Sequence, residues 1–498
     1  MTNADTQQIV MIGLDSADVD YVQAHLHALP RLRQLADQGS FCRLSSPGSA
    51  MSAAVWPTFY TGRDPGEHGF YFPMQFHAES MRLRRVTDDW LPCKTFWNRL
   101  SAQGIPVTTF DVQTHFPSGG SNSVEISNWG AQSYSKPLTN RPDLLEAIHQ
   151  RFGKHPMRHD VPQTKTDSQR MAIKDATSAG VGVKKDIALW LMQETDWRLF
   201  ITVFTECHRA GHYLWPTNSD ASTTNEDLLD IYRTLDSAIG DIVDRIDLQK
   251  TTVIIFSLHG MGPNSTQMHF MPQIMDRINV AFDKPSGDRV TFEQKPSRRH
   301  LMRFLRESLP PSLQNKIAEY APESVRDWVV SRQFGGGLNW SQTPGFALPT
   351  GGEGFIRLNV KGRERNGILE VGSERYLRYK DWVTRSFLSL RDRRTGEPVV
   401  EDIYDVPVCY PGERVDRLPD LIVTWRDIPP ATTLVSDVLG TMNAEFQAGR
   451  TGLHRPDGFA VICGNVPESA TNCPLSDIKD FSTFIESALT GARERVLV

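Results

Sequence analysis

Short runs of apolar residues that end abruptly in polar residues recur along this chain. The runs are Ile9–Leu14, Val107–Phe110, Leu199–Thr205 and Thr252–Ser257. Uninterrupted apolar runs of about four to eight residues are typical of strands that are buried on both faces of a parallel sheet. The pattern therefore predicts a mostly parallel central sheet.

Helical spacing of apolar residues appears between these runs. Residues Leu29–Ala36, closed by Gly39, and Asp227–Ile246 carry apolar side chains at steps of three and four residues, which predicts helices. Alternating strands and helices indicate an α/β fold with a doubly wound sheet flanked by helices. In such sheets the functional residues gather at the carboxyl ends of the strands. The polar residues that follow predicted strand ends include Asp15, Glu206, His208 and His259.

Two long stretches do not fit this alternation. Residues 130–177 are polar and rich in Arg, His and Gln, whereas residues 271–347 are basic, interrupted by Pro and helix-prone over 298–330. After Gly351 the pattern changes to short strands such as Phe355–Val360, and an apolar strand returns behind His454. We therefore expect one catalytic domain over residues 1–498, with insertions at 130–177 and 271–347 that form a cap or a substrate-specificity region.

Composition excludes several classes of protein. Hydrophobic residues make up 39% of the chain, and the formal net charge of -5 is spread without a long run of like charge, which argues against disorder and against nucleic-acid binding. The polar start and the short apolar runs predict a cytoplasmic protein without a membrane span. The cysteines lack a close paired spacing, which argues against a disulfide framework and a thiolate zinc site. For Cys207 we expect the role of a small buried residue.

Two residues near strand and helix ends are candidates for chemistry. Asp15 projects a carboxylate from the end of the first strand. Thr58 follows Pro57 in a turn closed by Gly62, which predicts a helix N-terminus where free amides favour an anion. A hydroxyl beside a metal can also become a nucleophile. The alternative is that both residues merely cap helices.

Four histidines are candidate metal ligands. His208 and His212 are four residues apart, so on a helix they share one face and can chelate one cation. His259 and His454 each lie beside glycines, after and before an apolar strand. Each of these two, taken alone, is equally consistent with a structural histidine.

In chain order the motifs are an Asp after the first strand, Pro-Thr-x-x-Thr-Gly, His-x-x-x-His, Ser-x-His-Gly and a late His-Arg. This ordered set resembles the alkaline phosphatase superfamily, and most closely its type I phosphodiesterase and nucleotide pyrophosphatase branch, from Asp15 to His454. The resemblance implies a three-layer α/β sandwich and a hydrolase that cleaves phosphate monoesters or diesters through a covalent Thr58 intermediate. It also implies two divalent cations, usually zinc. Matched by position, one cation belongs to Asp15, Thr58 and His259, and the other to His208, His212 and His454.

Two positions depart from the family pattern. Leu258 and His208 stand where the family carries aspartates. Because a leucine cannot bind a metal, the cation site of Asp15 loses a hard ligand, whereas three histidines still make a complete zinc set. We expect one tightly bound zinc at His208, His212 and His454. We expect the site of Asp15, Thr58 and His259 to be empty, weak or completed by another residue. The candidates for completing it are Glu206, Asn264 and His269, although Glu206 could instead orient His208 as a hydrogen-bond acceptor.

Other functions stay open at this point. Hydrolysis of sulfate or phosphonate esters could use the same scaffold, although a sulfatase would carry Cys or Ser at position 58. A binding protein that has lost catalysis is favoured by Leu258 and opposed by Thr58. In each case we expect a small anionic ester as the ligand. Arg298, Arg299 and His300 either meet an anionic leaving group or form a solvated basic helix face.

Overall fold

The fold was analysed in a computed structural model of the chain. The structure describes residues 7–91, 93–130, 136–157, 166–216, 226–283, 322–335, 338–349, 351–446, 449–466 and 475–491. The chain divides into two compact units. Unit 1 comprises Met1–Asp64, Thr87–Pro263 and Ala448–Val498, and unit 2 comprises Pro65–Val86 and Asn264–Gln447.

The described residues of unit 1 form an eight-stranded sheet in the order β2-β19-β9-β1-β8-β5-β6-β7. The parallel strands are β1 (Gln8–Leu14), β5 (Val107–Val112), β6 (Ser123–Ser127), β8 (Leu199–Phe204) and β9 (Thr251–Ser257). β19 (Gly458–Gly464) and β7 (Leu138–Thr139) run in the opposite direction to these strands, whereas the edge strand β2 (Ser40–Leu44) pairs antiparallel with β19 and so runs in the same direction as β9. The predicted α/β fold with a mostly parallel sheet is confirmed.

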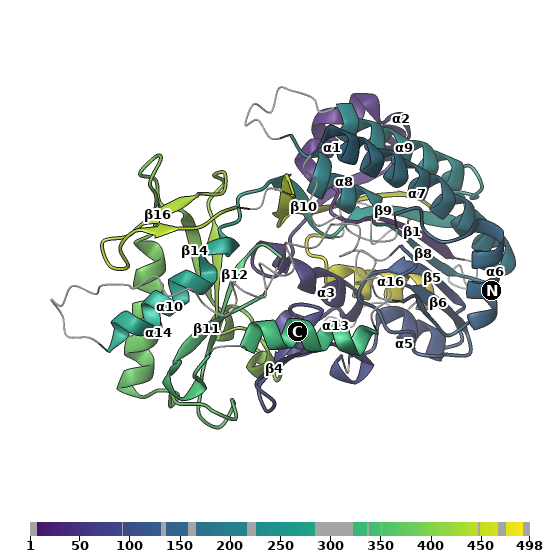
Figure 1. The fold of residues 1–498 in the computed structure, drawn as a ribbon. Helices are drawn as coiled ribbons and strands as arrows, with labels where there is room; N and C mark the ends of the chain where they lie inside the picture. The colour runs from purple at the N-terminus through teal and green to yellow at the C-terminus, as the bar shows by residue number, and fades with distance from the viewer. Residues whose placement is uncertain are drawn as a thin grey trace. The chain divides into compact units, whose positions relative to one another are not determined.

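Helices cover both faces of this sheet, because its central strands are apolar on both faces. In β1, Val10 and Ile12 face one core cluster, whereas Ile9 and Met11 face the other. The first cluster includes α1 (Val19–His25), α2 (Pro30–Gln38), α7 (Asp167–Glu194), α8 (Glu206–Leu214) and α9 (Glu226–Val243). The second includes α3 (Val55–Thr61), α5 (Phe96–Ala102) and α16 (Asp480–Thr490). Figure 1 shows these two helical layers on either side of the strands, as expected for a three-layer sandwich.

Unit 2 is built on an antiparallel sheet with its own core. The sheet has the order β11-β12-β15-β14. Its strands are β11 (Gly345–Leu348), β12 (Gly354–Leu358), β14 (Val400–Asp405) and β15 (Leu421–Trp425). Helices α10 (Met271–Phe282) and α14 (Glu374–Leu388) pack on it through one apolar cluster. Smaller elements are the hairpin of β3 (Met74–His77) and β4 (Arg82–Arg85), α4 (Pro65–His68), α13 (Glu323–Gly335), α15 (Val406–Cys409), and the strands β13 (Arg391–Asp392), β16 (Thr433–Val435) and β17 (Met442–Asn443).

The two stretches expected to be insertions belong to different parts of the structure. Residues 130–177 were expected to lie outside the sheet, but β7 lies within this range and pairs with β6 at the sheet edge, and α6 (Pro142–Phe152) follows. The described residues of 271–347 belong to unit 2. The single domain with two insertions stays a prediction, and Arg298, Arg299 and His300 lie outside the described residues.

Two further expectations concern cysteines and membranes. Cys42, in β2, is disulfide-bonded, which the spacing argument did not anticipate. Cys207 has a free thiol and is buried, and its Sγ donates to the Asp15 carbonyl oxygen at 2.8 Å, as expected of a small interior residue. Within the described ranges, no helix combines the length and the apolar character that crossing a membrane requires.

Candidate functional site

The carboxyl ends of three neighbouring strands bring the predicted residues together. β1 lies between β8 and β9 and runs parallel to both, so the three strands end at the same edge of the sheet. Asp15 follows β1, and its backbone N–H donates to the Phe204 carbonyl oxygen at the end of β8 at 3.0 Å. α8 begins at Glu206 directly after β8, and His259 follows β9 by two residues.

A two-stranded antiparallel sheet brings the fourth histidine to α8. β10 (Gly260–Pro263) pairs antiparallel with β18 (Gly452–Arg455), which sets His454 opposite Met261. β18 approaches α8 closely, because a Cβ on Gly452 would lie only 2.1 Å from the Gly211 carbonyl oxygen. Glycine at position 452 is therefore required for this contact.

The three histidines expected to form the tight cation site converge. His208 Nε2 lies 2.9 Å from His212 Nε2 and 2.9 Å from His454 Nε2. The ring centroids of His212 and His454 are 4.9 Å apart. The prediction that this trio comes together therefore agrees with the geometry.

Hydrogen bonds to the other ring nitrogens define what these Nε2 atoms can do. His212 Nδ1 lies 2.9 Å from the Gly452 carbonyl oxygen, which can only accept, so Nδ1 carries the proton and Nε2 a lone pair. His208 Nδ1 lies 2.7 Å from Asp15 Oδ2 and donates to this carboxylate, so in the neutral ring its Nε2 also carries a lone pair. With a neutral His208 ring, two lone pairs face each other at 2.9 Å, an arrangement that a bound cation or a shared proton between the two nitrogens would stabilise.

Burial keeps the surrounding histidines uncharged. It lowers the pKa of His212 and of His454 well below the usual range, and the nearby positive charge of Arg450 acts in the same direction. Burial also lowers the pKa of His259 to about 4, although Asp15 opposes this shift. Neutral imidazole is the form that binds metal ions. The cluster is therefore prepared for a cation at neutral pH.

The donor set fits zinc at three of the four histidines. Zn–N bonds of about 2.0–2.1 Å in a tetrahedral site place neighbouring ligand nitrogens about 3.3 Å apart. The His208–His212 and His208–His454 separations of 2.9 Å come near this value. Ligand nitrogens of His208, His259 and His454 all lie within 4.8 Å of one another, so His259 belongs to the same compact group of ligand atoms as His208 and His454.

Asp15 is the hydrogen-bond acceptor that orients His208. Its Oδ1 accepts from Trp56 Nε1 at 3.1 Å, and its Oδ2 accepts from His208. Burial raises the pKa of Asp15, but His208 and His259 outweigh burial, so the net shift is downward and the side chain is a carboxylate. The contact with Trp56 was not predicted from the sequence, although Trp56 precedes Thr58 by only two residues.

Glu206 does not have the role that the sequence suggested. Its Oε1 accepts from His155 Nε2 at 2.8 Å and its Oε2 from Lys184 Nζ at 3.1 Å. Burial raises its pKa, but Lys184 and His155 outweigh burial and lower it to about 2. Both carboxylate oxygens are thus used in the interior, and Asp15 rather than Glu206 orients His208.

Thr58 is the fourth residue of α3 rather than its first. The helix starts at Val55, Pro57 is its third residue, and the Gly62 N–H donates to the Thr58 carbonyl oxygen at 3.0 Å. The proline signal misplaced the helix start because proline is accepted throughout the first turn, where backbone N–H groups have no partner in the helix. The Thr58 side chain is buried.

The remaining positions behave differently. Leu258 packs in the apolar cluster of α3 and α16, so position 258 supplies no ligand. His259 Nε2 lies 2.8 Å from the hydroxyl of Ser16, a residue with a φ of 60°. In unit 2, Asn264 Oδ1 accepts from the Thr266 N–H at 3.1 Å, and His269 Nε2 donates to the Ala431 carbonyl oxygen at 2.7 Å.

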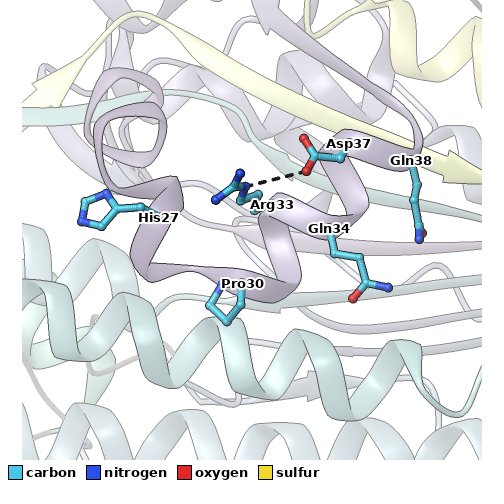
Figure 2. A pocket seen from close by; sticks show the side chains of 6 residues that line it. All are labelled: His27, Pro30, Arg33, Gln34, Asp37 and Gln38. Carbon is cyan, nitrogen blue, oxygen red and sulfur yellow. Dashed lines mark ion pairs between the residues drawn. The ribbon is translucent and has the colours of Figure 1, made fainter.

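A surface hollow on α2 is the alternative candidate site. Figure 2 shows the side chains that line this space of about 400 Å³, namely His27, Pro30, Arg33, Gln34, Asp37 and Gln38. Arg33 and Asp37 form an ion pair at 3.7 Å with both side chains largely exposed. Exposed pairs of this kind contribute little, and the lining offers no convergent ligands, so the histidine cluster is the better candidate site.

Known structures share the fold of this chain. Phosphonoacetate hydrolase from Sinorhizobium meliloti 1021 matches with TM-scores of 0.52 in complex with phosphonoacetate and 0.51 in complex with phosphonoformate. Both comparisons have 11% sequence identity and cover 97% of this chain and 96% of the other. A murine ectonucleotide pyrophosphatase/phosphodiesterase 5 in complex with AMP gives a TM-score of 0.48 at 11% identity, over 97% and 95% of the two chains. No curated protein matches the sequence.

The family comparison goes further than the fold. Residues 9–327 match the family model of type I phosphodiesterase / nucleotide pyrophosphatase. This range exceeds half of the chain, and it contains the first strand, Thr58 and three of the four clustered histidines. The chain therefore belongs to the type I phosphodiesterase/nucleotide pyrophosphatase family of the alkaline phosphatase superfamily.

Proposed function

We propose that this chain is a metal-dependent hydrolase that cleaves phosphate monoesters or diesters with Thr58 as the nucleophile. Family membership supports the coarser statement that it is a phosphoester hydrolase. The proposal adds one divalent cation, zinc, held by His208, His212 and His454, and a small anionic ester as substrate.

The observation that carries the proposal is the convergence of three histidine Nε2 atoms. Nε2 of His208 faces Nε2 of His212 and Nε2 of His454, each at 2.9 Å. One proton could bridge only two of the three atoms, whereas one cation can bind all three. The hydrogen bonds from Nδ1 of His208 and of His212 fix both rings in the orientation that a cation needs.

The protein residues have distinct tasks in this proposal. Asp15 holds His208, and the Gly452 carbonyl oxygen holds His212. A bound zinc would supply Lewis acidity, which draws charge from phosphoryl oxygens and lowers the pKa of a nearby hydroxyl. Trp56 links α3, the helix of Thr58, to the same Asp15.

The covalent route has two displacements. Thr58 Oγ1 forms a bond to phosphorus as the bond from phosphorus to the leaving oxygen breaks, and the hydroxyl proton ends on the leaving alcohol. Water then attacks phosphorus, the bond to Thr58 breaks, and Thr58 regains a proton. Because the Thr58 side chain is buried, this route requires that the phosphoryl group reach a site shielded from solvent.

A substrate panel tests the reaction class. Purified protein would be assayed with p-nitrophenyl phosphate, bis-p-nitrophenyl phosphate, p-nitrophenyl sulfate and phosphonoacetate, before and after chelation and with zinc added back. Phosphate-ester turnover that is lost on chelation and restored by zinc supports the proposal. Turnover of sulfate or phosphonoacetate alone would replace the substrate class, and zinc binding without turnover of any substrate would indicate a binding protein.

The cytoplasmic location expected from the sequence is also part of the proposal. The disulfide of Cys42 weighs against it, because disulfides are rare in the reducing cytosol. Fractionation of the native host cells, with an antibody against the chain, would show whether the protein is in the cytoplasm or in an oxidising compartment.

A further inference from the structure

Helix α8 carries charged side chains into the protein interior as well as histidines toward the cluster. Glu206 and Arg209 have no exposed surface. At about 100° per residue, Glu206 lies on a different face of the helix from His208 and His212, whereas Arg209 lies about 60° from His212. Burying charge is costly unless opposite charges and hydrogen bonds compensate it. The compensation comes from a group of residues that the proposed reaction does not use.

Lys184 of α7 lies at the centre of this group. It occupies the buried stripe of α7 together with Val181, Ile187, Ala188 and Leu191, where an apolar residue would be expected. Its Nζ lies 2.7 Å from Asp111 Oδ2 and 3.1 Å from Glu206 Oε2, and it donates to Thr205 Oγ1 at 3.1 Å. The three hydrogens of the ammonium group therefore have three acceptors.

Asp111 is held in an unusual backbone conformation to reach Lys184. Its φ is 62°, at the point in β5 where the pairing register with β6 shifts. The Gly130 N–H donates to its carboxylate at 3.0 and 3.1 Å. A Cβ on Gly130 would lie 2.7 Å from Asp111 Oδ2 and 3.2 Å from Lys184 Nζ. A left-handed aspartate persists only where its surroundings impose it.

The remaining contacts complete the group. His155 Nε2 lies 2.8 Å from Glu206 Oε1, and glycine at position 180 of α7 makes room for it, because a Cβ there would lie 2.8 Å from His155 Nε2. Arg209 Nη2 donates to the Gly130 carbonyl oxygen at 2.8 Å. The cations Lys184 and Arg209 thus balance the carboxylates of Asp111 and Glu206.

We propose that Lys184 is a positioning residue for the histidine cluster. Lys184, Asp111, Glu206 and Arg209, which we term the charge lock, tie the first turn of α8 to α7 and to the end of β5, and so set where His208 and His212 lie. This inference rests on the proposed function only in that the positioned histidines are taken to bind a cation.

Stability alone is a poor account of the charge lock. Replacing a whole buried ion-pair group with apolar residues of similar volume is often neutral or stabilising, so apolar side chains at positions 111, 184 and 206 together would serve the core as well. Metal ligands, in contrast, must be held within about 0.5 Å of their working positions by the groups behind them. The contacts of Lys184 and His155 with Glu206, and of Arg209 with the Gly130 carbonyl oxygen, hold the first turn of α8 from three parts of the chain and supply such a constraint.

Amide hydrogen exchange of α8 tests the lock without relying on activity. Exchange would be measured on the full-length chain, with and without Zn²⁺, in wild type, in Lys184→Met and in Glu125→Gln. Glu125 is the matched control, because it is a fully buried carboxylate paired with His115 at 2.9 Å elsewhere in unit 1. The lock predicts that the α8 amides exchange faster in Lys184→Met than in Glu125→Gln, relative to α16 in the same protein.

Zinc affinity and the spectrum of bound Co²⁺ provide the second readout. Loss of a group that orients metal ligands typically costs about 10- to 100-fold in metal affinity, so Lys184→Met should weaken zinc binding by at least about tenfold. It should also change the visible d–d bands of bound Co²⁺, which report ligand geometry. Glu125→Gln should leave both unchanged, even if it lowers the melting temperature.

The outcomes separate this inference from the proposed function. Equal α8 exchange in both variants, or a zinc affinity in Lys184→Met within threefold of wild type, would overturn the positioning role. If Lys184→Met does not fold, Glu206→Gln, which keeps the side-chain shape and loses the charge, decides by the same two measurements. A wild-type chain that binds no zinc would contradict the proposed function, whereas the exchange of α8 without metal would still test the lock.

Discussion

His208 uses both of its ring nitrogens, and this makes it the central residue of the cluster. Its Nδ1 bonds to Asp15, and its Nε2 faces His212 and His454. The family resemblance leads us to expect an aspartate at this position, where this chain has an imidazole instead of a carboxylate. Asp15 supplies a negative charge on the far side of the His208 ring from the cation, as in the carboxylate–histidine–zinc arrangement.

Asp15→Asn should therefore weaken zinc binding by about 10- to 100-fold, because the amide is uncharged and can present its NH₂ group to His208. Competition with a chromophoric chelator measures this. Asp18→Asn is the control, since Asp18 caps α1 by accepting from the Tyr21 N–H, a bond that an asparagine keeps. Equal zinc affinities of the two variants would show that Asp15 does not orient His208.

Thr58→Ala should abolish phosphate-ester turnover while zinc binding stays intact, because only the attacking oxygen is removed. Thr58→Ser should retain part of the rate. The measurement is kcat/KM together with zinc content. A Thr58→Ala rate above about a tenth of wild type, a loss of less than about 1.4 kcal/mol in the barrier, would favour direct attack by water.

At this scale the four-residue spacing predicted that His208 and His212 lie together, because spacing on a helix is a local property, whereas the placement of His454 beside them followed from the family resemblance. The partners of Asp15 and Glu206 were not predictable. Trp56 reaches Asp15 from α3, and Lys184 reaches Glu206 from α7, on the other side of β8 in the sequence. Both contacts arise from the packing of separate helices, which no local pattern reveals.

At the scale of elements, the apolar runs predicted the central strands to within a residue or two. The run Val107–Phe110 ended too early, because β5 continues through Asp111, a charged residue that Lys184 compensates. β6 was missed altogether. Its sequence Ser-Val-Glu-Ile-Ser is polar, yet it is fully buried, and Glu125 is satisfied by His115, Trp97 and Ser123.

The approach of β18 to α8 makes a prediction for Gly452→Ala. The added Cβ would meet the Gly211 carbonyl oxygen at 2.1 Å, so the strand must move and carry away both His454 and the acceptor of His212 Nδ1. Zinc affinity should fall by at least about tenfold.

Gly182→Ala in α7 is the matched control for this change. Nothing lies within 4 Å of its added Cβ, so it should raise stability by about 0.4–1 kcal/mol and leave zinc binding unchanged. If Gly452→Ala binds zinc as tightly as Gly182→Ala, the β18 contact does not set the position of His454.

At the scale of the whole molecule, the sequence predicted the three-layer unit but not the extent of the second unit. Unit 2 joins Pro65–Val86 to Asn264–Gln447, and segments so distant in the chain share no local pattern that would reveal their association. Apolar runs predict the core strands, whereas no local pattern predicts which distant segments of the chain fold together.

Acid should weaken unit 1 through Glu125. Burial raises its pKa, but His115 and Ser123 outweigh burial and lower it to about 2, from an ordinary value of 4.5. The folded pKa is thus depressed, so this stability, on the order of 3 kcal/mol, is present above pH 4.5 and is lost as the pH falls toward 2.

The difference in melting temperature between wild type and Glu125→Gln should therefore be largest near neutral pH and shrink below pH 4.5. Thermal unfolding followed by circular dichroism across this range measures it. A difference that does not change with pH would mean that Glu125 is not ionised in the folded chain.

The most direct test of the account is the number and position of bound zinc ions. Elemental analysis after gel filtration in metal-free buffer, combined with anomalous diffraction above and below the zinc edge, gives both. The account predicts one zinc per chain, bound by His208, His212 and His454, with a weak or empty site beside Asp15 and His259. Two equally occupied zinc sites, or an active enzyme without metal at the three histidines, would contradict it.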